Sequence, residues 1–201
     1  MSTVQSTNEA LSSSSDKSSN YQSPISIKSS KNKLSSSNLH IDIIIAKILL
    51  HILAENKKSK DYYKKINSTK DGHFTVLMKP SISLLDYLKR IIKYTRIEIS
   101  TLIIAIIYID RVCKEKIFLN EYNIHRVMLI AIYIAYTYNE DCTYDNKYLA
   151  LVSGISKSEM VLLEQDFLEL IDFKLFVSEE LFIQYRNYIY KSIDNFNKVS
   201  F

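Results

Sequence analysis

The sequence predicts an all-α domain that follows a serine-rich N-terminal segment. From residue 39 onward, apolar residues recur at intervals of three and four, which is the spacing of an amphipathic helix. Isoleucine-rich runs also suit strands, but a run such as 95–115 contains neither glycine nor proline, and its length favours a helix. Helix-start signals precede several runs, and no segment shows the convincing alternation typical of a strand.

The composition indicates a soluble protein of the cytoplasm or nucleus with one ordinary domain. A hydrophobic content of 47% is enough for a core, and the net charge of +4 permits an acidic partner without indicating nucleic-acid binding. Cys113 and Cys142 lie in no CxxC motif, which fits reduced thiols rather than a metal site. No signal sequence is visible, and the apolar stretch 127–136 is far shorter than the ~20 residues that span a bilayer, so we expect no membrane partner.

The chain divides into three regions that differ in composition. Residues 1–38 contain 15 serines and few large apolar groups, so we expect a disordered tail, with Ser23-Pro24 as a minimal proline-directed phosphorylation site. Residues 39–195 are the expected folded domain, and 196–201 form its C-terminal end. The expected helices span 39–58, 80–95, 95–115, 121–139, 145–154 and 156–171, with a short last helix that starts at 178.

The first half of the domain has three helix-start signals. Pro80 suits the first turn of a helix, where its missing N–H is not needed. Thr95 and Glu98 have the spacing of a capping box for the third helix, and Asn120 can cap the fourth. The fourth helix is apolar on every side, which predicts a helix buried at the centre of the fold.

The second half has the clearest local signals. A short helix starts at Asp145 or Asn146 and stops at Gly154. Ser156 and Glu159 then form a capping box for the next helix. Ser178 precedes two glutamates, which are favoured at the positive end of the last helix.

The sequence shows no catalytic or cofactor-binding motif. Two glycines leave no glycine-rich loop for phosphates. The four histidines lack metal-ligand spacing, and carboxylate pairs fall at expected loops and helix starts. An enzyme is therefore the weaker reading, although a grouping formed only in space is not visible in a sequence.

Five sequence blocks resemble the cyclin box, and in detail that of the P/U-type (phosphate-system) cyclins. They occur in family order and nearly family spacing between residues 39 and 188: PSISLLDYLKRI, AIIYIDRV, NIHRVMLIAIYIAY, YDNKYLALVSGIS and EMVLLEQDFLELIDFKL. The resemblance implies a single box, about 80–175, with five helices around a central buried one, an extra N-terminal helix and a short C-terminal helix. About 28 residues follow Phe173, too few for the second five-helix repeat of mitotic cyclins.

The resemblance implies a regulatory subunit and not an enzyme. Such a cyclin binds the catalytic subunit of a cyclin-dependent Ser/Thr protein kinase beside its C helix, orders the active site and contributes no catalytic group or cofactor. The alternative is a cyclin-fold scaffold that binds a transcription protein or nucleic acid without kinase activation. By resemblance, the kinase-facing residues are Thr137, Tyr138, Glu140, Glu164, Leu168, Phe173 and Leu175.

The physical argument for a binding role is strongest at Glu164, because an unpaired carboxylate at the edge of an apolar face is unfavourable. Most cyclins pair it with a lysine on the third box helix, but this chain has Thr137 there. Three alternatives stay open: a basic kinase residue pairs with Glu164, nearby Lys147 substitutes, or the box has drifted away from kinase activation.

The same resemblance assigns structural roles to four residues. The YIDR element, which contains Asp110 and Arg111, closes the second box helix. Asp110 is expected to be buried against the start of the first box helix and to face Ser81. Arg126 is expected to anchor the third box helix or to contact another chain, with a solvated helix-start arginine as the alternative.

Overall fold

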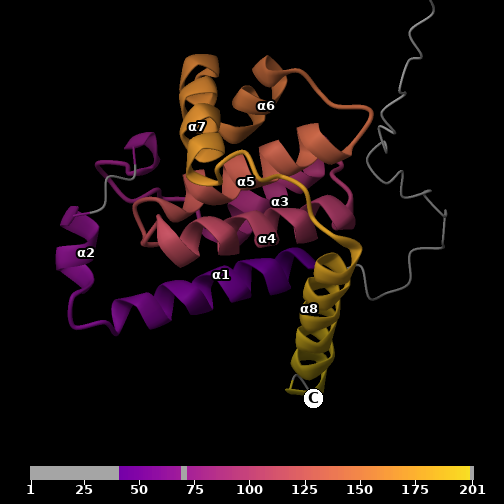
Figure 1. The fold of residues 1–201 in the computed structure, drawn as a ribbon, viewed down its shortest axis with the longest axis horizontal. Coiled ribbons are helices and arrows are strands. Elements are labelled where there is room, and N and C mark those ends of the chain that lie inside the picture. Colours follow the sequence, from indigo (N-terminus) through magenta and orange to yellow (C-terminus); the bar gives the residue numbers. More distant parts are fainter. Residues whose placement is uncertain (1–40, 69–71, 200–201) are drawn as a thin grey trace, which may run out of the picture. The chain divides into compact units, whose positions relative to one another are not determined.

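Helices account for all the regular structure in residues 41–68 and 72–199, the part of the chain that the computed structural model describes (Figure 1). This part contains no strand, so the predicted all-α class is confirmed. The expected tail over 1–38, its Ser23-Pro24 motif and residues 200–201 lie outside the described residues. The elements are α1 (Ile41–Lys57), α2 (Tyr62–Ser68), η2 (a 3-10 helix, Gly72–Phe74), α3 (Leu84–Thr95), α4 (Ile99–Glu115), α5 (Ile124–Asn139), α6 (Asn146–Ser153), α7 (Lys157–Leu170) and α8 (Glu179–Val199).

Two helices differ from the expectation. No helix was expected between residues 58 and 80, but this segment contains α2, whose buried Tyr62 ring packs edge-on against Phe118 at 5.8 Å between ring centroids. The last helix was expected to be short, but α8 has 21 residues. It packs against α1 and α4 and buries Ile189 completely. Tertiary packing of this kind stabilises helices beyond what local signals predict.

Three predicted helix starts are wrong. Thr95 ends α3, and its hydroxyl donates to the carbonyl of Ile91 (2.7 Å) instead of capping α4. The N-cap of α3 is Ser83, three residues after Pro80, and its hydroxyl accepts from the Asp86 N–H (3.0 Å). The N-cap of α5 is residue 123 rather than residue 120. Of the three observed N-cap residues, only Ser83 caps its helix through its side chain, whereas the N-caps of α4 and α5 make no such hydrogen bond.

The helix boundaries around α6 and α7 are confirmed. The Asp145 carboxylate accepts from the Tyr148 N–H at 2.7 Å and begins α6. Gly154 ends it with φ of 75°, a left-handed conformation that few other residues adopt without strain. The Ser156 hydroxyl accepts from the Glu159 N–H at 3.1 Å and begins α7.

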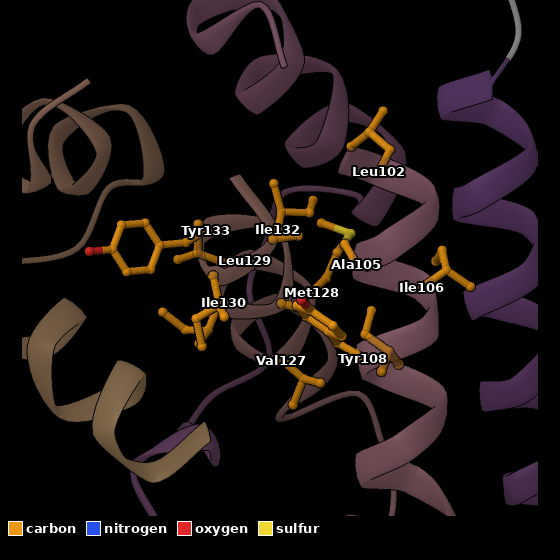
Figure 2. Packing of buried hydrophobic residues seen from close by; sticks show 14 of the residues in the cluster. Leu102, Ala105, Ile106, Tyr108, Val127, Met128, Leu129, Ile130, Ile132 and Tyr133 are labelled. Atoms are coloured by element: carbon orange, nitrogen blue, oxygen red, sulfur yellow. The ribbon is translucent and has the colours of Figure 1, made fainter. Parts of the chain in front are cut away.

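Helix α5 lies at the centre of the core, as its sequence predicted. Every residue from Val127 to Tyr136 is buried, because α4 packs along one side of the helix and α7 along another. In Figure 2 the hydroxyl of Tyr133 points away from Tyr108 on α4. Although α5 is apolar on every side, no helix in the described ranges is long and apolar enough to cross a membrane.

Candidate protein-binding face

The YIDR element holds the segment between α7 and α8. The Tyr108 hydroxyl donates to the carbonyl of Leu175 (2.7 Å), and the guanidinium of Arg111 donates to the carbonyls of Lys174 (2.6 Å) and Phe176 (3.0 Å). The guanidinium also lies 5.9 Å from the centroid of the Tyr108 ring. Three consecutive carbonyls are therefore bonded to α4. We call Tyr108 and Arg111 the α4 clamp.

Asp110 has different partners from those expected. Its carboxylate accepts a hydrogen bond from the Tyr185 hydroxyl of α8 and pairs with Lys114 one turn further along α4 (2.8 Å). The carboxylate is partly exposed rather than buried, and Ser81 is itself exposed. Burial and the nearby Asp110 charge raise the pKa of Tyr185. Asp110 thus binds the last helix, because α8 packs on this end of α4.

The clamped segment presents two aromatic rings to solvent. Phe173 is 68% exposed and Phe176 is 66% exposed. Asp172 and Phe173 have φ of 52° and 54°, a conformation that non-glycine residues adopt only where surrounding contacts hold it. One such contact is the ion pair between Asp172 and Lys116 (2.7 Å). Phe173 was predicted as a binding residue. The sequence analysis did not name Phe176, which is exposed in the same segment.

Glu164 has no basic partner within the described residues. Its carboxylate accepts only from the Tyr133 hydroxyl, at 3.4 Å, and that hydroxyl also lies 2.9 Å from the side-chain oxygen of Asn146. Burial raises the pKa of Glu164, and the Tyr133 hydrogen bond opposes this rise only in part. Lys147, considered as a substitute for the missing lysine, is exposed and makes no ion pair with Glu164. The pairing of Glu164 is therefore left open to a partner.

Thr137 and Leu168 lie on the same side of the α5–α7 pair as Glu164. Arg126 near the start of α5 binds Glu159 near the start of α7, and Tyr133, two turns on, reaches Glu164. The two helices therefore run in the same general direction. One turn later on the same helix faces come Thr137 and Leu168.

We group these residues with exposed and half-buried neighbours along the chain and call the group the candidate face. It includes the exposed Tyr138 on the last turn of α5, the half-buried Leu168 and Leu175, and the two exposed rings after α7. Its members are Thr137, Tyr138, Glu164, Leu168, Phe173, Leu175 and Phe176. The sequence had named six of these seven.

Glu140 acts within the chain rather than on this face. Its carboxylate oxygen accepts from the Glu98 N–H (3.1 Å) and the Thr101 hydroxyl (2.6 Å), and so caps the start of α4. Burial raises the pKa of Glu140, while these two hydrogen bonds oppose the rise. A carboxylate at this position also interacts favourably with the positive end of the helix. Glu140 was predicted to face the kinase, and its side chain is already occupied.

Arg126 anchors the start of α5, which was one of its two expected roles. Its guanidinium donates to the carbonyl of His73 (2.5 Å) and binds Glu159. Asp166 of α7 accepts from the His73 N–H (2.8 Å). At Gly72, with φ of 56°, an added Cβ would meet the Asp166 carboxylate at 2.3 Å. These contacts fasten η2 to α7.

Neither a thiol pair nor a metal site is found in the described part of the chain. Cys113 and Cys142 are free thiols. In the ranges 41–68 and 72–199, no group of three or more His, Cys, Asp or Glu side chains is placed to hold a metal ion.

Replacing Glu164 with glutamine is expected to raise the midpoint of thermal unfolding at pH 7 by a few degrees at most. Burial raises the pKa of Glu164 above its ordinary value of 4.5, so the folded chain binds this proton more readily than the unfolded chain. Protonated Glu164 therefore contributes its full stabilisation below the ordinary pKa of 4.5. This contribution is lost as the pH rises through the higher pKa that Glu164 has in the folded chain. Scanning calorimetry should therefore show a higher unfolding midpoint for Glu164→Gln than for the wild type at pH 7, and this difference should disappear toward about pH 4.

Glu169→Gln provides the control for this measurement. Glu169 is exposed on the same helix, so its substitution should leave the midpoint unchanged at both pH values. An advantage of Glu164→Gln that is equally large at pH 4 would contradict the expected linkage.

Comparison with known proteins identifies the class. A family model described as Cyclin matches residues 2–175, and the all-helical architecture agrees with a cyclin box. The chain therefore belongs to the cyclin family.

The relatives place it in the P/U type. Cyclin-U4-3 of Arabidopsis thaliana is 42% identical over 58% of this chain and 54% of the relative. Cyclin-P4-1 of Oryza sativa subsp. japonica is 37% identical over 56% of this chain and 54% of the relative. PHO85 cyclin-7 of Saccharomyces cerevisiae is 30% identical over 74% of this chain and 59% of the relative. The predicted resemblance to P/U-type cyclins is confirmed, and the matches span a little over half the length of these relatives.

Proposed function

We propose that the chain is the regulatory subunit of a cyclin-dependent Ser/Thr protein kinase. It binds beside the C helix of the kinase through the candidate face and activates the kinase without contributing a catalytic group. Membership of the cyclin family and similarity to a protein named PHO85 cyclin-7 support a kinase partner. Phosphoryl transfer then belongs entirely to the kinase, whose mobile elements the bound cyclin orders.

Glu164 carries the proposal. The structure keeps its carboxylate half-buried with only a long hydrogen bond to Tyr133, an arrangement that is unfavourable until a cation or an N–H group approaches. A kinase backbone amide or basic side chain would supply that group. Because Thr137 stands where most cyclins have a lysine, and no lysine of the described residues pairs with Glu164, the donor would have to come from the partner.

The apolar part of the face supplies affinity. Phe173 and Phe176 project from a backbone segment that the α4 clamp already fixes. Full burial of such a side chain against a partner stabilises a complex by about 1.5–3 kcal/mol. Because the segment is held before binding, little conformational entropy is lost when a partner covers it. The face thus combines two apolar anchors with one acceptor that needs a donor.

Charge reversal at Glu164 is the test. The full chain, carrying an affinity tag, would be used to capture proteins from the lysate of its source cell, and the captured material would be assayed for kinase activity on a generic substrate and identified by mass spectrometry. Glu164→Arg is expected to reduce the captured cyclin-dependent kinase activity at least about tenfold, because interface charges that bond a partner are sensitive to removal.

Glu169→Arg is the matched control, since it reverses an exposed charge on the same helix outside the candidate face. Activity recovered with the wild type and with Glu169→Arg, but lost with Glu164→Arg, would support the proposal. Absence of a cyclin-dependent kinase from the wild-type capture would contradict it and favour the scaffold alternative. Equal capture of kinase activity by Glu164→Arg would show that Glu164 does not contribute to the interface.

A further inference from the structure

A shallow surface hollow lies over α6 and the start of α7 and shares no lining residue with the candidate face. Its volume is about 570 Å³, which is within the range of sites that hold small ligands or single peptide side chains. The lining residues are Asp145, Lys147, Tyr148, Ala150, Leu151, Ile155 and Lys157.

The rim of the hollow is cationic. Lys147 and Lys157 are exposed, and neither forms an ion pair within the described residues. The only carboxylate in the lining is that of Asp145, which already accepts the Tyr148 N–H at the start of α6. The hollow therefore has two free positive charges and one negative charge that is already hydrogen-bonded.

Most of the lining of the hollow is apolar. Leu151 lies in the second half of α6 and is 72% exposed. Ala150 and Ile155 continue the apolar lining on either side of it. An exposed leucine alone is ordinary on a protein surface. Here it borders a shallow hollow with two further apolar residues, where a partner's apolar side chain could contact several groups at once.

Two hydrogen bonds join α6, which carries most of the lining residues, to α3. The Tyr148 hydroxyl donates to the carbonyl of Tyr94 (2.9 Å), and the Tyr87 hydroxyl donates to the carbonyl of Ser153 (3.0 Å). These bonds fix both ends of α6, so the site is formed before a ligand arrives and binding loses little entropy at its walls.

We propose that this hollow binds a short acidic peptide segment of a partner protein, with one large apolar side chain inserted over Leu151. Lys147 and Lys157 would bind carboxylates on either side of that residue. A basic segment would be repelled by the two lysines, and a purely acidic one would leave the apolar lining uncovered. The site is separate from the candidate face and does not depend on the kinase role.

Fluorescence anisotropy with the full chain alone tests the site. The probes are labelled short peptides of Asp and Glu around one central Leu, Met or Phe. Matched peptides carry central Ser, or Lys and Arg in place of the acids. The acidic peptides with an apolar centre are expected to bind, and Lys147→Glu combined with Lys157→Glu should weaken binding at least about tenfold. Leu151→Ser should weaken it several-fold and remove the preference for the apolar centre.

The control variant combines Lys60→Glu and Lys191→Glu, which change the net charge equally at exposed lysines outside the hollow. It should bind the acidic peptides as the wild type does. The proposal is overturned if no acidic peptide binds by about 1 mM, if the control variant weakens binding equally, or if central Ser binds as well as the apolar residues. Because no kinase is present, these outcomes are independent of the capture experiment with Glu164→Arg.

Discussion

Replacing Phe167 with alanine is expected to lower the free energy of unfolding by about 3–5 kcal/mol. Phe167 on α7 is completely buried, and its ring packs edge-on against Phe74 at 6.1 Å between centroids. The substitution removes a large apolar side chain and leaves a cavity that the surrounding helices fill only in part. It also removes the aromatic contact between α7 and η2. Urea unfolding followed by circular dichroism measures the loss.

Leu162→Ala is the matched control on the same helix. Leu162 is 40% exposed, so its truncation should lower the free energy of unfolding by less than about 1 kcal/mol. The comparison separates burial from helix propensity, because both substitutions place alanine within α7. Similar losses for the two variants would contradict the burial that the structure assigns to Phe167.

Loss of the α4 clamp is expected to open the segment between α7 and α8. The double variant Tyr108→Phe, Arg111→Ala removes three hydrogen bonds to consecutive carbonyls, two of them from a charged donor. Together these bonds stabilise the closed segment by about 3 kcal/mol, which corresponds to about a hundredfold more of the open form. Cleavage by trypsin after Lys174, quantified by mass spectrometry, should accelerate by a similar factor when opening is fast relative to cleavage.

Arg186→Ala with Tyr188→Phe makes the same two chemical changes at exposed positions of α8. This control should leave cleavage after Lys174 unchanged. The urea midpoint of each variant distinguishes local opening from global unfolding, since a local effect accelerates this cleavage more than cleavage elsewhere. An unchanged rate in the clamp variant would show that packing alone holds the segment. The clamp variant would also test whether a fixed segment is needed for kinase capture.

The parts of the fold that could be predicted from the sequence depend on neighbours along the chain. Asp145, Gly154 and Ser156 were assigned correctly because a cap bonds to an N–H or carbonyl a few residues away. The central position of α5 followed from an apolar run without a polar side. The cyclin family was recognisable because five such blocks keep their order and spacing.

The candidate site was predicted only in part. Glu164 and Phe173 were named correctly as positions that the fold leaves without a partner or exposed, whereas their role in kinase binding stays a proposal. The capping role of Glu140 was not visible in the sequence, because its partners, Glu98 and Thr101, lie about forty positions earlier in the chain; its part in kinase binding stays a prediction. Phe176, which the sequence analysis did not name, is exposed in the same segment, and its carbonyl accepts from Arg111.

The sequence by itself determined most of the helical segments, although not α2 or the length of α8, as well as which helix is central and to which family the chain belongs. Those properties come from hydrophobic spacing and short-range hydrogen bonds. Only the tertiary structure decided what the YIDR element does: Tyr108 and Arg111 hold the segment after α7, and Asp110 binds Tyr185 of α8. The partners of these side chains lie more than sixty residues away. Helix packing brings them together, and no local spacing encodes that pairing.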